Sequence, residues 1–266
     1  MHLTMSVVIV TGGTFGIGHA ITVLLAQRGH QVVALGLSAP QVSSTAAGTE
    51  GIREELARHG LKADVLEADV SSAADVQYAV DHAIQHYGRI DGLVNNAAVG
   101  PLGSVLDTDE ATWDRIIDVN LKGAYLCSRA VIPHMARQGG GAIVNVGSGA
   151  GWGKPNMAAY SSSKGGMVAL TMAMAYDHFH DHVRVNMVIP GGGGIVTGMS
   201  VGRFGGDVAK FTSRASPGTV AGRVATPMDI ARPVAFLLSE DAAVISGTVL
   251  DVGCFAHQGG PVPAPH

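Results

Sequence analysis

The segment MAAYSSSKGG places a tyrosine four residues before a lysine, with three serines between them. If the segment is helical, the side chains of Tyr160 and Lys164 lie on one face. A free tyrosine has a pKa of about 10, too high for proton transfer near neutral pH, and a fixed ammonium nearby lowers that pKa. The pair therefore indicates a general acid/base tuned by a lysine. We interpret the three serines as helix filler on other faces; the alternative for the whole segment is a solvated serine-rich bend.

Two polar residues elsewhere could complete such a site. Ser148 ends a predicted strand twelve residues before Tyr160, and its hydroxyl could hold a substrate oxygen on which charge develops. The alternative is a cap at the strand end. Asn120 lies inside a predicted long helix, where asparagine is a mediocre helix former. Its alternative is an exposed surface residue.

A glycine-rich turn, TGGTFGIG, follows the first predicted strand and opens the first predicted helix. Gly12, Gly16 and Gly18 would permit a tight turn, close backbone approach to a pyrophosphate, and close packing of helix on sheet. Exposed amides at the helix N-terminus favour phosphate. A nucleoside-triphosphatase loop is excluded, because no Lys-Ser/Thr pair follows the glycines. The turn predicts a dinucleotide site, and the alternative is a glycine turn that only packs.

Elements that must position these residues alternate along the chain. Strands are predicted at 6–13, 31–36, 62–70, 91–98, 141–148, 182–190 and 247–253, and helices at 16–30, 49–60, 72–88, 109–137, 158–179 and 226–241. This alternation predicts an α/β fold, a doubly wound parallel sheet of Rossmann type in three layers. Ligands of such sheets bind beyond the carboxyl ends of the strands, where the candidate residues lie.

Composition narrows the class further. The 266 residues are 47% hydrophobic and 14% charged, which suits one domain with a sheet buried on both faces. We expect a catalytic domain over 1–254, with a substrate-loop region at about 195–222, and a Pro/Gly-rich tail over 255–266. The net charge of −4 gives no footprint for nucleic acid. No stretch is long enough to span a membrane, and two distant cysteines match no metal-site spacing, so we predict a cytoplasmic protein without a metal.

These motifs, in this order, resemble the short-chain dehydrogenase/reductase family. They are TGGTFGIG, ADV at 68–70, NNAA at 95–98, VNLKG at 119–123, VNVGS at 144–148, YSSSK at 160–164 and RVNMVIPGG at 184–192. The resemblance implies hydride transfer between a nicotinamide cofactor and a secondary alcohol or ketone, in a homotetramer or homodimer. It assigns catalysis to Asn120, Ser148, Tyr160 and Lys164. Asn120 would mark a helix kink and hold a water that relays protons to Lys164, which would also bind the nicotinamide ribose.

The resemblance also implies the cofactor contacts. They are Gly12, Thr14, Phe15, Gly16, Ile17, Gly18, Leu37, Ser38, Asp69, Val70, Asn96, Ala97, Ala98, Tyr160, Lys164, Pro190, Gly191, Ile195 and Thr197. Ala98 departs from the family's usual glycine, and two extra glycines delay Thr197. The second strand ends in VVALGLS, with neither an Asp/Glu for NAD nor an Arg for NADP. The missing carboxylate favours NADP, and use of both NAD and NADP stays open.

The sequence leaves two alternative functions open and also predicts a substrate pocket. A reductase of 3-oxoacyl thioesters is the alternative enzyme, and a catalytically silent dinucleotide-binding sensor is the alternative outside catalysis. The region 198–222 is interpreted as a substrate lid that orders on binding. Lys154 and Arg203 could meet an anionic group. The apolar pocket residues we expect are Trp152, Met157, Met199, Phe204 and Phe211.

Overall fold

One parallel sheet forms the centre of the protein. The computed structural model describes residues 6–37, 49–191, 195–203, 205–213 and 219–254. Its strands are β1 (Val7–Thr11), β2 (Gln31–Gly36), β3 (Asp64–Glu67), β4 (Gly92–Asn95), β5 (Gly141–Val146), β6 (Val183–Ile189) and β7 (Val249–Asp251). They pair in the order β3-β2-β1-β4-β5-β6-β7, each neighbour parallel to the next. The predicted fold class is therefore confirmed.

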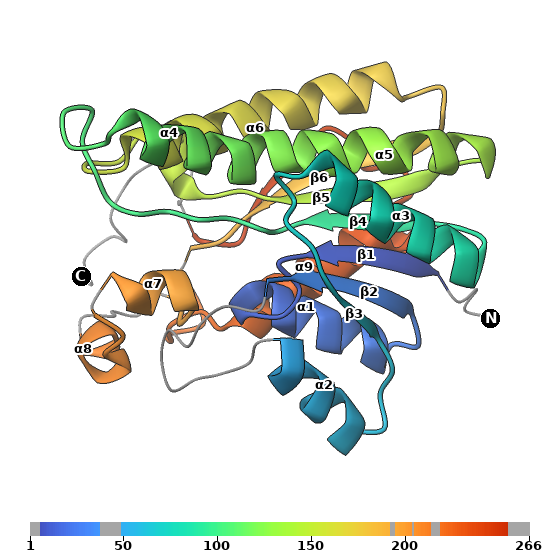
Figure 1. The fold of residues 1–266 in the computed structure, drawn as a ribbon, viewed down its shortest axis with the longest axis horizontal. Coiled ribbons are helices and arrows are strands. Elements are labelled where there is room, and N and C mark those ends of the chain that lie inside the picture. Colours follow the sequence, from blue (N-terminus) through green and yellow to red (C-terminus); the bar gives the residue numbers. More distant parts are fainter. Residues whose placement is uncertain (1–5, 38–48, 192–194, 204, 214–218, 255–266) are drawn as a thin grey trace.

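Helices cover both faces of this sheet (Figure 1). Those assigned in the described residues are α1 (Gly16–Gln27), α2 (Thr49–Arg58), α3 (Ala73–Tyr87), α4 (Glu110–Ile117), α5 (Gly123–Arg137), α6 (Ala158–Asp177), α7 (Gly198–Gly202), α8 (Val208–Thr212) and α9 (Pro227–Leu238). Helices α3 to α6 lie on one side, and α1 and α9 pack against each other on the other side. The result is the predicted three-layer arrangement.

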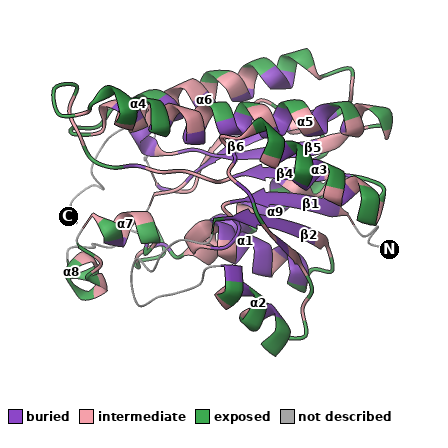
Figure 2. Cartoon of the chain, viewed as in Figure 1, coloured by how far each residue is buried: buried purple, intermediate pink, exposed green. Residues whose placement is uncertain are grey.

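The burial of strand β1 shows why the sheet needs a helical layer on each face. All five of its residues are buried, and successive side chains point to opposite faces. Val8 and Val10 join the core beneath α1 and α9, whereas Val7 and Ile9 join the core beneath α3 and α5. Figure 2 shows the buried residues concentrated along the strands between the two helical layers. A continuous apolar run is thus required, as the composition indicated.

The chain reverses its direction of travel across the sheet at β1. From β1 it moves to β2 and β3, and it then returns to place β4 on the other side of β1. The carboxyl ends of the parallel strands share one edge, and α7 and α8 lie at that end of the sheet (Figure 1). A ligand crevice is expected at such a reversal. The topology therefore places the glycine turn and the residues after β4 and β5 around one crevice.

Several boundaries differ from the sequence predictions. The helix predicted at 109–137 is three segments, because a π-helical turn, Asp118–Lys122, separates α4 from α5. The region after β6, predicted to be irregular, contains α7 and α8. The third strand is limited to β3: Ala68 N still bonds Gly36 O at the end of β2, but the N–H of Asp69 already bonds Asp75 in α3. Among the described helices, none is long and apolar enough to cross a membrane. The tail over 255–266 lies outside the described residues.

Candidate active site

The first turns of α6 are held against the loop that follows β4. Gly103 donates its backbone N–H to Asn156 O at 2.9 Å and accepts from Ala158 N at 3.1 Å. These bonds flank the start of α6, whose first residues are helical without a side-chain cap at Met157. The loop therefore fixes where Tyr160 points.

Tyr160 meets Ser148 at the end of β5. The side chain of Ser148 lies close enough to Tyr160 to affect its hydroxyl, and Ser148 Oγ accepts the backbone N–H of Ala150 at 3.2 Å. Ser148 thus fills the capping role and neighbours the tyrosine as well. Burial of the ring raises the pKa of Tyr160, while the neighbouring Ser148 hydroxyl and the charge of Arg203 act in the lowering direction. The lowered pKa predicted from the sequence is not found in the chain by itself, because burial outweighs the opposing effects.

Lys164 is buried beneath the tyrosine. Only 2% of its surface is exposed, and Nζ donates to Val146 O at 2.8 Å. The ammonium lies 5.9 Å from the centroid of the Tyr160 ring. Burial lowers the pKa of Lys164 to about 8. The lysine and tyrosine therefore share one helix face, as the spacing predicted, with the charge anchored to the end of β5.

Asn120 lies in the π-helical turn and is fully buried. Its Oδ1 accepts from Val99 N at 2.8 Å, and its Nδ2 donates to Val99 O at 2.9 Å and to Ser163 Oγ at 3.0 Å. The interpretation of Asn120 as an exposed surface residue is wrong. The helix is distorted at this residue, in the place where the family resemblance implied a kink. The side chain ties the turn to the loop after β4 and to α6.

Ser163 is the residue that the sequence interpretation missed. It is fully buried, accepts from Asn120 Nδ2, and donates its Oγ–H to Tyr160 O at 2.8 Å. Its interpretation as filler on another helix face is therefore wrong. Its spacing held a signal, because a residue three positions after Tyr160 shares that residue's helix face. A small polar residue there can bond a partner on a neighbouring element.

The glycine turn is tight and closely packed. Gly12 and Gly16 adopt φ of 59° and 53°, where other residues are strained. A Cβ at Gly18 would lie 2.0 Å from Gly12 O. Phe15 caps α1 without a side-chain hydrogen bond, and no acidic residue stands in the first turn. Amides at this helix end are thus available to an anion, and the residues fit a dinucleotide.

Residues from two other loops brace this turn. Asn96 Nδ2 donates to Thr11 O at 3.1 Å and to Gly12 O at 3.0 Å. Thr197 lies against Gly16, where an added Cβ would come within 3.3 Å of Thr197 Cβ. The threonine also caps α7 by accepting from Ser200 N at 3.1 Å. Despite the extra glycines, Thr197 therefore reaches the predicted cofactor crevice.

Asp69 and Leu37, two residues predicted to contact the adenosine half of the cofactor, lie in the described part of the chain. Asp69 accepts hydrogen bonds from Ser71 and, at 3.1 Å, from Arg115 Nη1. Although burial of Asp69 acts to raise its pKa, these bonds and the Arg115 charge lower it overall. Leu37 follows β2 with its side chain exposed. Ser38 lies outside the described residues.

The remaining predicted contacts occupy the same edge of the sheet. Thr14 and Val70 are buried, Ile195 is buried among the residues of the α1 and α9 core, and Ala97 backs against Gly12. The others lie at the start of α1 or in the segments after β4 and β6: Phe15, Ile17, Ala98, Pro190 and Gly191. The structure thus gathers the described candidates at one end of the strands.

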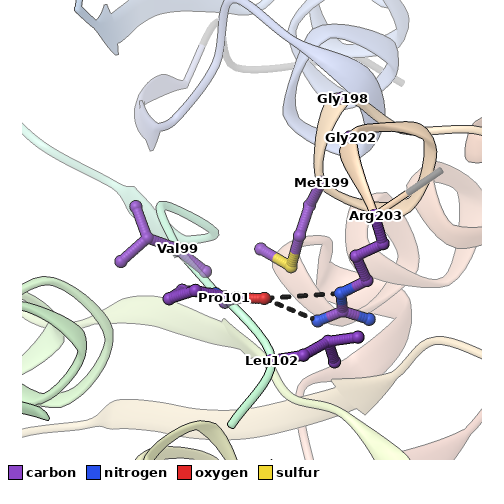
Figure 3. Close-up of a pocket in the computed structure, with 9 residues that line it drawn as sticks. Val99, Pro101, Leu102, Gly198, Met199, Gly202 and Arg203 are labelled. Atoms are coloured by element: carbon purple, nitrogen blue, oxygen red, sulfur yellow. Dashed lines mark hydrogen bonds between the residues drawn. The ribbon is translucent and has the colours of Figure 1, made fainter. Parts of the chain in front are cut away.

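A cavity of about 520 Å³ lies between the loop after β4 and α7, and two of its lining residues, Gly100 and Arg203, neighbour the Tyr160 ring. Arg203 donates through Nε and Nη2 to Gly100 O, at 3.3 and 3.0 Å (Figure 3). Its Cζ lies 5.7 Å from the Tyr160 ring centroid. The cavity is lined by Ala98, Val99, Gly100, Pro101, Leu102, Gly198, Met199, Gly202 and Arg203.

Other residues expected in the pocket are placed differently. Trp152 and Lys154 are exposed and do not line the cavity. Of the predicted apolar residues Met199 lines it, Met157 and Phe211 do not, and Phe204 lies outside the described residues. Among the described residues no group of three or more His, Cys, Asp or Glu could hold a metal ion.

Comparison with known proteins agrees with this geometry. Residues 6–204 match the family described as short chain dehydrogenase. The chain is 40% identical to 2-(S)-hydroxypropyl-CoM dehydrogenase 3 of Xanthobacter autotrophicus over 94% of this chain and 96% of the relative. It is 32% identical to the 3-oxoacyl-acyl-carrier-protein reductase FabG of Thermotoga maritima, over 95% and 98%.

A solved structure extends the likeness to three dimensions. The ligand-free aldohexose dehydrogenase of Thermoplasma acidophilum superposes with a TM-score of 0.81, at 32% identity and 98% coverage of both chains. The silent-sensor alternative is not supported, since these relatives are dehydrogenases and reductases. The chain belongs to the short-chain dehydrogenase family and is an alcohol dehydrogenase or reductase of that family.

Proposed function

We propose that this enzyme interconverts a small secondary alcohol and its ketone, with Tyr160 as general acid/base. The observation that carries the proposal is the convergence of Tyr160, Ser148 and the buried Lys164, whose Nζ lies 5.9 Å from the tyrosine ring, next to an apolar cavity. A bound nicotinamide dinucleotide supplies hydride exchange. The residues of the chain would hold and protonate the substrate oxygen.

The roles follow from the chemistry of each side chain. Ser148 donates a hydrogen bond to the substrate oxygen as negative charge develops there. Tyr160 gives that oxygen its proton in reduction and takes it back in oxidation. The raised pKa of Tyr160 keeps the phenol protonated near neutral pH, which is the form needed for reduction. The Lys164 ammonium, 5.9 Å from the ring, stabilises the phenolate left after proton transfer.

The proposal extends to NADP as the preferred cofactor. β2 ends at Gly36 and Leu37 follows, so no carboxylate at this position repels a 2′-phosphate. A comparison of kcat/KM for NADPH and NADH over a panel of ketones measures the preference. A 3-oxoacyl thioester belongs in that panel, because reduction of its keto group needs the same residues.

Assembly as a homodimer or homotetramer and a cytoplasmic location stay predictions. Trp113 on α4 and Tyr125 on α5 expose large apolar surface, which supports association through this helical layer. The two cysteines, Cys127 and Cys254, are unpaired, which supports a reducing compartment.

Tyr160→Phe tests the acid/base role. Turnover is expected to fall by about 10²–10⁴-fold, the contribution of a positioned acid/base. The dissociation constant of the cofactor, measured by fluorescence titration, should change little, because the ring and its packing are kept. Full turnover by this variant would refute the role of Tyr160.

A further inference from the structure

The cavity beside Tyr160 has one charged lining residue. Val99, Leu102 and Met199 give apolar walls, and the rest of the described lining, apart from Arg203, is alanine, proline and glycine. Figure 3 shows the guanidinium of Arg203 at this wall, opposite Val99 and beside Met199. A cation placed in an apolar wall calls for a partner, because burying an unpaired charge is costly.

Among the described residues, the hydrogen bonds of Arg203 use only two of its donor nitrogens. Nε and Nη2 both donate to the same atom, Gly100 O. A guanidinium carries five N–H donors, so one carbonyl cannot satisfy it. No ion pair joins Arg203 to a carboxylate among the described residues. Residues outside the described ranges include no aspartate or glutamate, so no acidic side chain elsewhere is left to serve.

Other arginines of the chain behave differently. Arg223 pairs with Asp229 at 2.6 Å, and Arg89 pairs with Asp91 at 2.6 Å. Both of those arginines are on the exposed surface, where a counterion matters least for solvation. The partly buried Arg203, which has the greater need of one, contacts a carbonyl and the Tyr160 ring but no carboxylate among the described residues. The contrast indicates that the counterion of Arg203 is a ligand.

The position of Arg203 relates that ligand to the proposed chemistry. A Cβ placed on Gly100 would lie 2.8 Å from Tyr160 Cδ2 and 3.0 Å from both Arg203 Nη2 and Met199 Sδ. These side chains therefore converge on one small volume. A group bound to Arg203 would lie only a few bonds from a carbon whose oxygen meets Tyr160.

Resting on the proposed function, we infer that Arg203 recognises an oxyanion on the substrate, so that the substrate class is short oxo acids and hydroxy acids. Carboxylate and sulfonate share the chemistry that matters, namely two oxygens that accept from one guanidinium. The apolar walls would hold the short carbon chain between that anion and the reacting carbon. The alternative is a latch, in which Arg203 only fastens α7 to Gly100.

The test compares acids with their neutral amides. Kinetics with NADPH are measured for 3-oxobutanoate, 4-oxopentanoate and 5-oxohexanoate, each against its amide, in the wild type and in Arg203→Met. We expect kcat/KM in the wild type to favour the best acid by roughly ten- to a hundredfold, as charged hydrogen bonds do. Arg203→Met should lower the rate with the acid far more than the rate with its amide, and so abolish that preference.

Two further variants sharpen the comparison. Arg203→Lys keeps the positive charge but loses the planar, paired N–H donors of the guanidinium. It should therefore retain part of the preference for the acid that Arg203→Met loses. Lys154→Met removes a cation that does not line the cavity, and it should leave the acid-to-amide ratio unchanged. Equal loss of acid and amide rates in Arg203→Met would establish the latch and overturn the inference, as would a wild type without preference for any acid.

Calorimetry separates this inference from the proposed function. Binding of the same acids and amides to the NADPH complex of Tyr160→Phe needs no turnover. Acid-selective binding that depends on Arg203 supports the inference even if the acid/base proposal fails. Absence of selective binding there overturns it, whatever the kinetic role of Tyr160.

Discussion

Two parts of the candidate active site are built in opposite ways. The catalytic side, which we define as Asn120, Ser148, Tyr160, Ser163 and Lys164, contains buried hydrogen bonds within α6, from the π-helical turn to α6, and from α6 to the end of β5. The substrate side, residues 195–213, carries α7 and α8. Seven residues of α6 are buried, whereas α7 buries only Val201 and α8 buries none.

The difference separates chemistry from selectivity. Proton transfer needs groups held at fixed distances, and a buried network provides that. Recognition of the rest of the substrate can lie on short elements attached at few points, because a change there does not disturb the core. Thr197 against Gly16 and Arg203 on Gly100 are two such attachments.

The largest effect should come from the glycine turn that both sides share. In Gly18→Ala the new Cβ would lie 2.0 Å from the Gly12 carbonyl oxygen, so the backbone must move. We expect a loss of about 1–3 kcal/mol in stability from overpacking and a drop in cofactor affinity of about a hundredfold. Thermal unfolding and cofactor titration measure the two effects.

A matched change on the substrate side provides the control. Gly202 in α7 has nothing within 4 Å of an added Cβ. Gly202→Ala should leave global stability and cofactor affinity unchanged within error. If Gly202→Ala weakened cofactor binding as strongly as Gly18→Ala, the separation of the two sides would be wrong.

A second effect concerns pH and the buried lysine. Burial lowers the pKa of Lys164 from its ordinary 10.5 to about 8. Between these values the unfolded chain binds the proton and the folded chain does not. Stability contributed by this group therefore rises with pH through that window, by on the order of 3 kcal/mol in all.

Comparison with Lys164→Met isolates this effect. The Cys127 thiol acts in the opposite direction, since burial raises its pKa to about 12 and folding is then penalised at high pH. Its contribution is the same in both proteins and cancels in the difference. Urea unfolding at pH 7.5 and 9.5 should show the wild type gaining on the variant at the higher pH. A difference that is independent of pH would contradict the burial of the Lys164 charge.

Sequence patterns predicted the catalytic side better than the substrate side, for a physical reason. The four-residue spacing of Tyr160 and Lys164 and the turn after β1 are local patterns, which a helix or a strand converts directly into geometry. The partners of Asn120 come from a loop and a helix distant in sequence, so its burial could not be foreseen. The π-helical turn likewise depends on tertiary bonds to Val99 and Ser163.

On the substrate side, the position of a residue in the sequence did not show whether it lines the cavity. Lys154 and Arg203 were equal candidates for an anionic group in the sequence, and only the fold distinguishes the exposed Lys154 from Arg203 at the cavity wall. Glycine-rich composition predicted irregular structure there, but local caps such as Thr197 with Ser200 begin short helices.

The smallest effect is a pair of serine substitutions that compares the two sides directly. In Ser163→Ala the buried Asn120 Nδ2 loses one of its two acceptors, and we expect about 1–2 kcal/mol of global destabilisation. Turnover should fall less than tenfold, because Ser163 bonds the Tyr160 carbonyl and not its hydroxyl. In Ser200→Ala the lost bonds are those of the hydroxyl to Ile195 and Thr197, at the start of α7, so global stability should change by less than about 0.5 kcal/mol.

Amide hydrogen exchange distinguishes the two outcomes. Ser200→Ala should increase exchange only around α7, whereas Ser163→Ala should lower protection across α6 and the sheet. Equal global destabilisation by both serine variants would show that α7 folds as part of the core. The substrate side would then be as fixed as the catalytic side, and changes of selectivity at Arg203 would carry a stability cost that the present geometry does not predict.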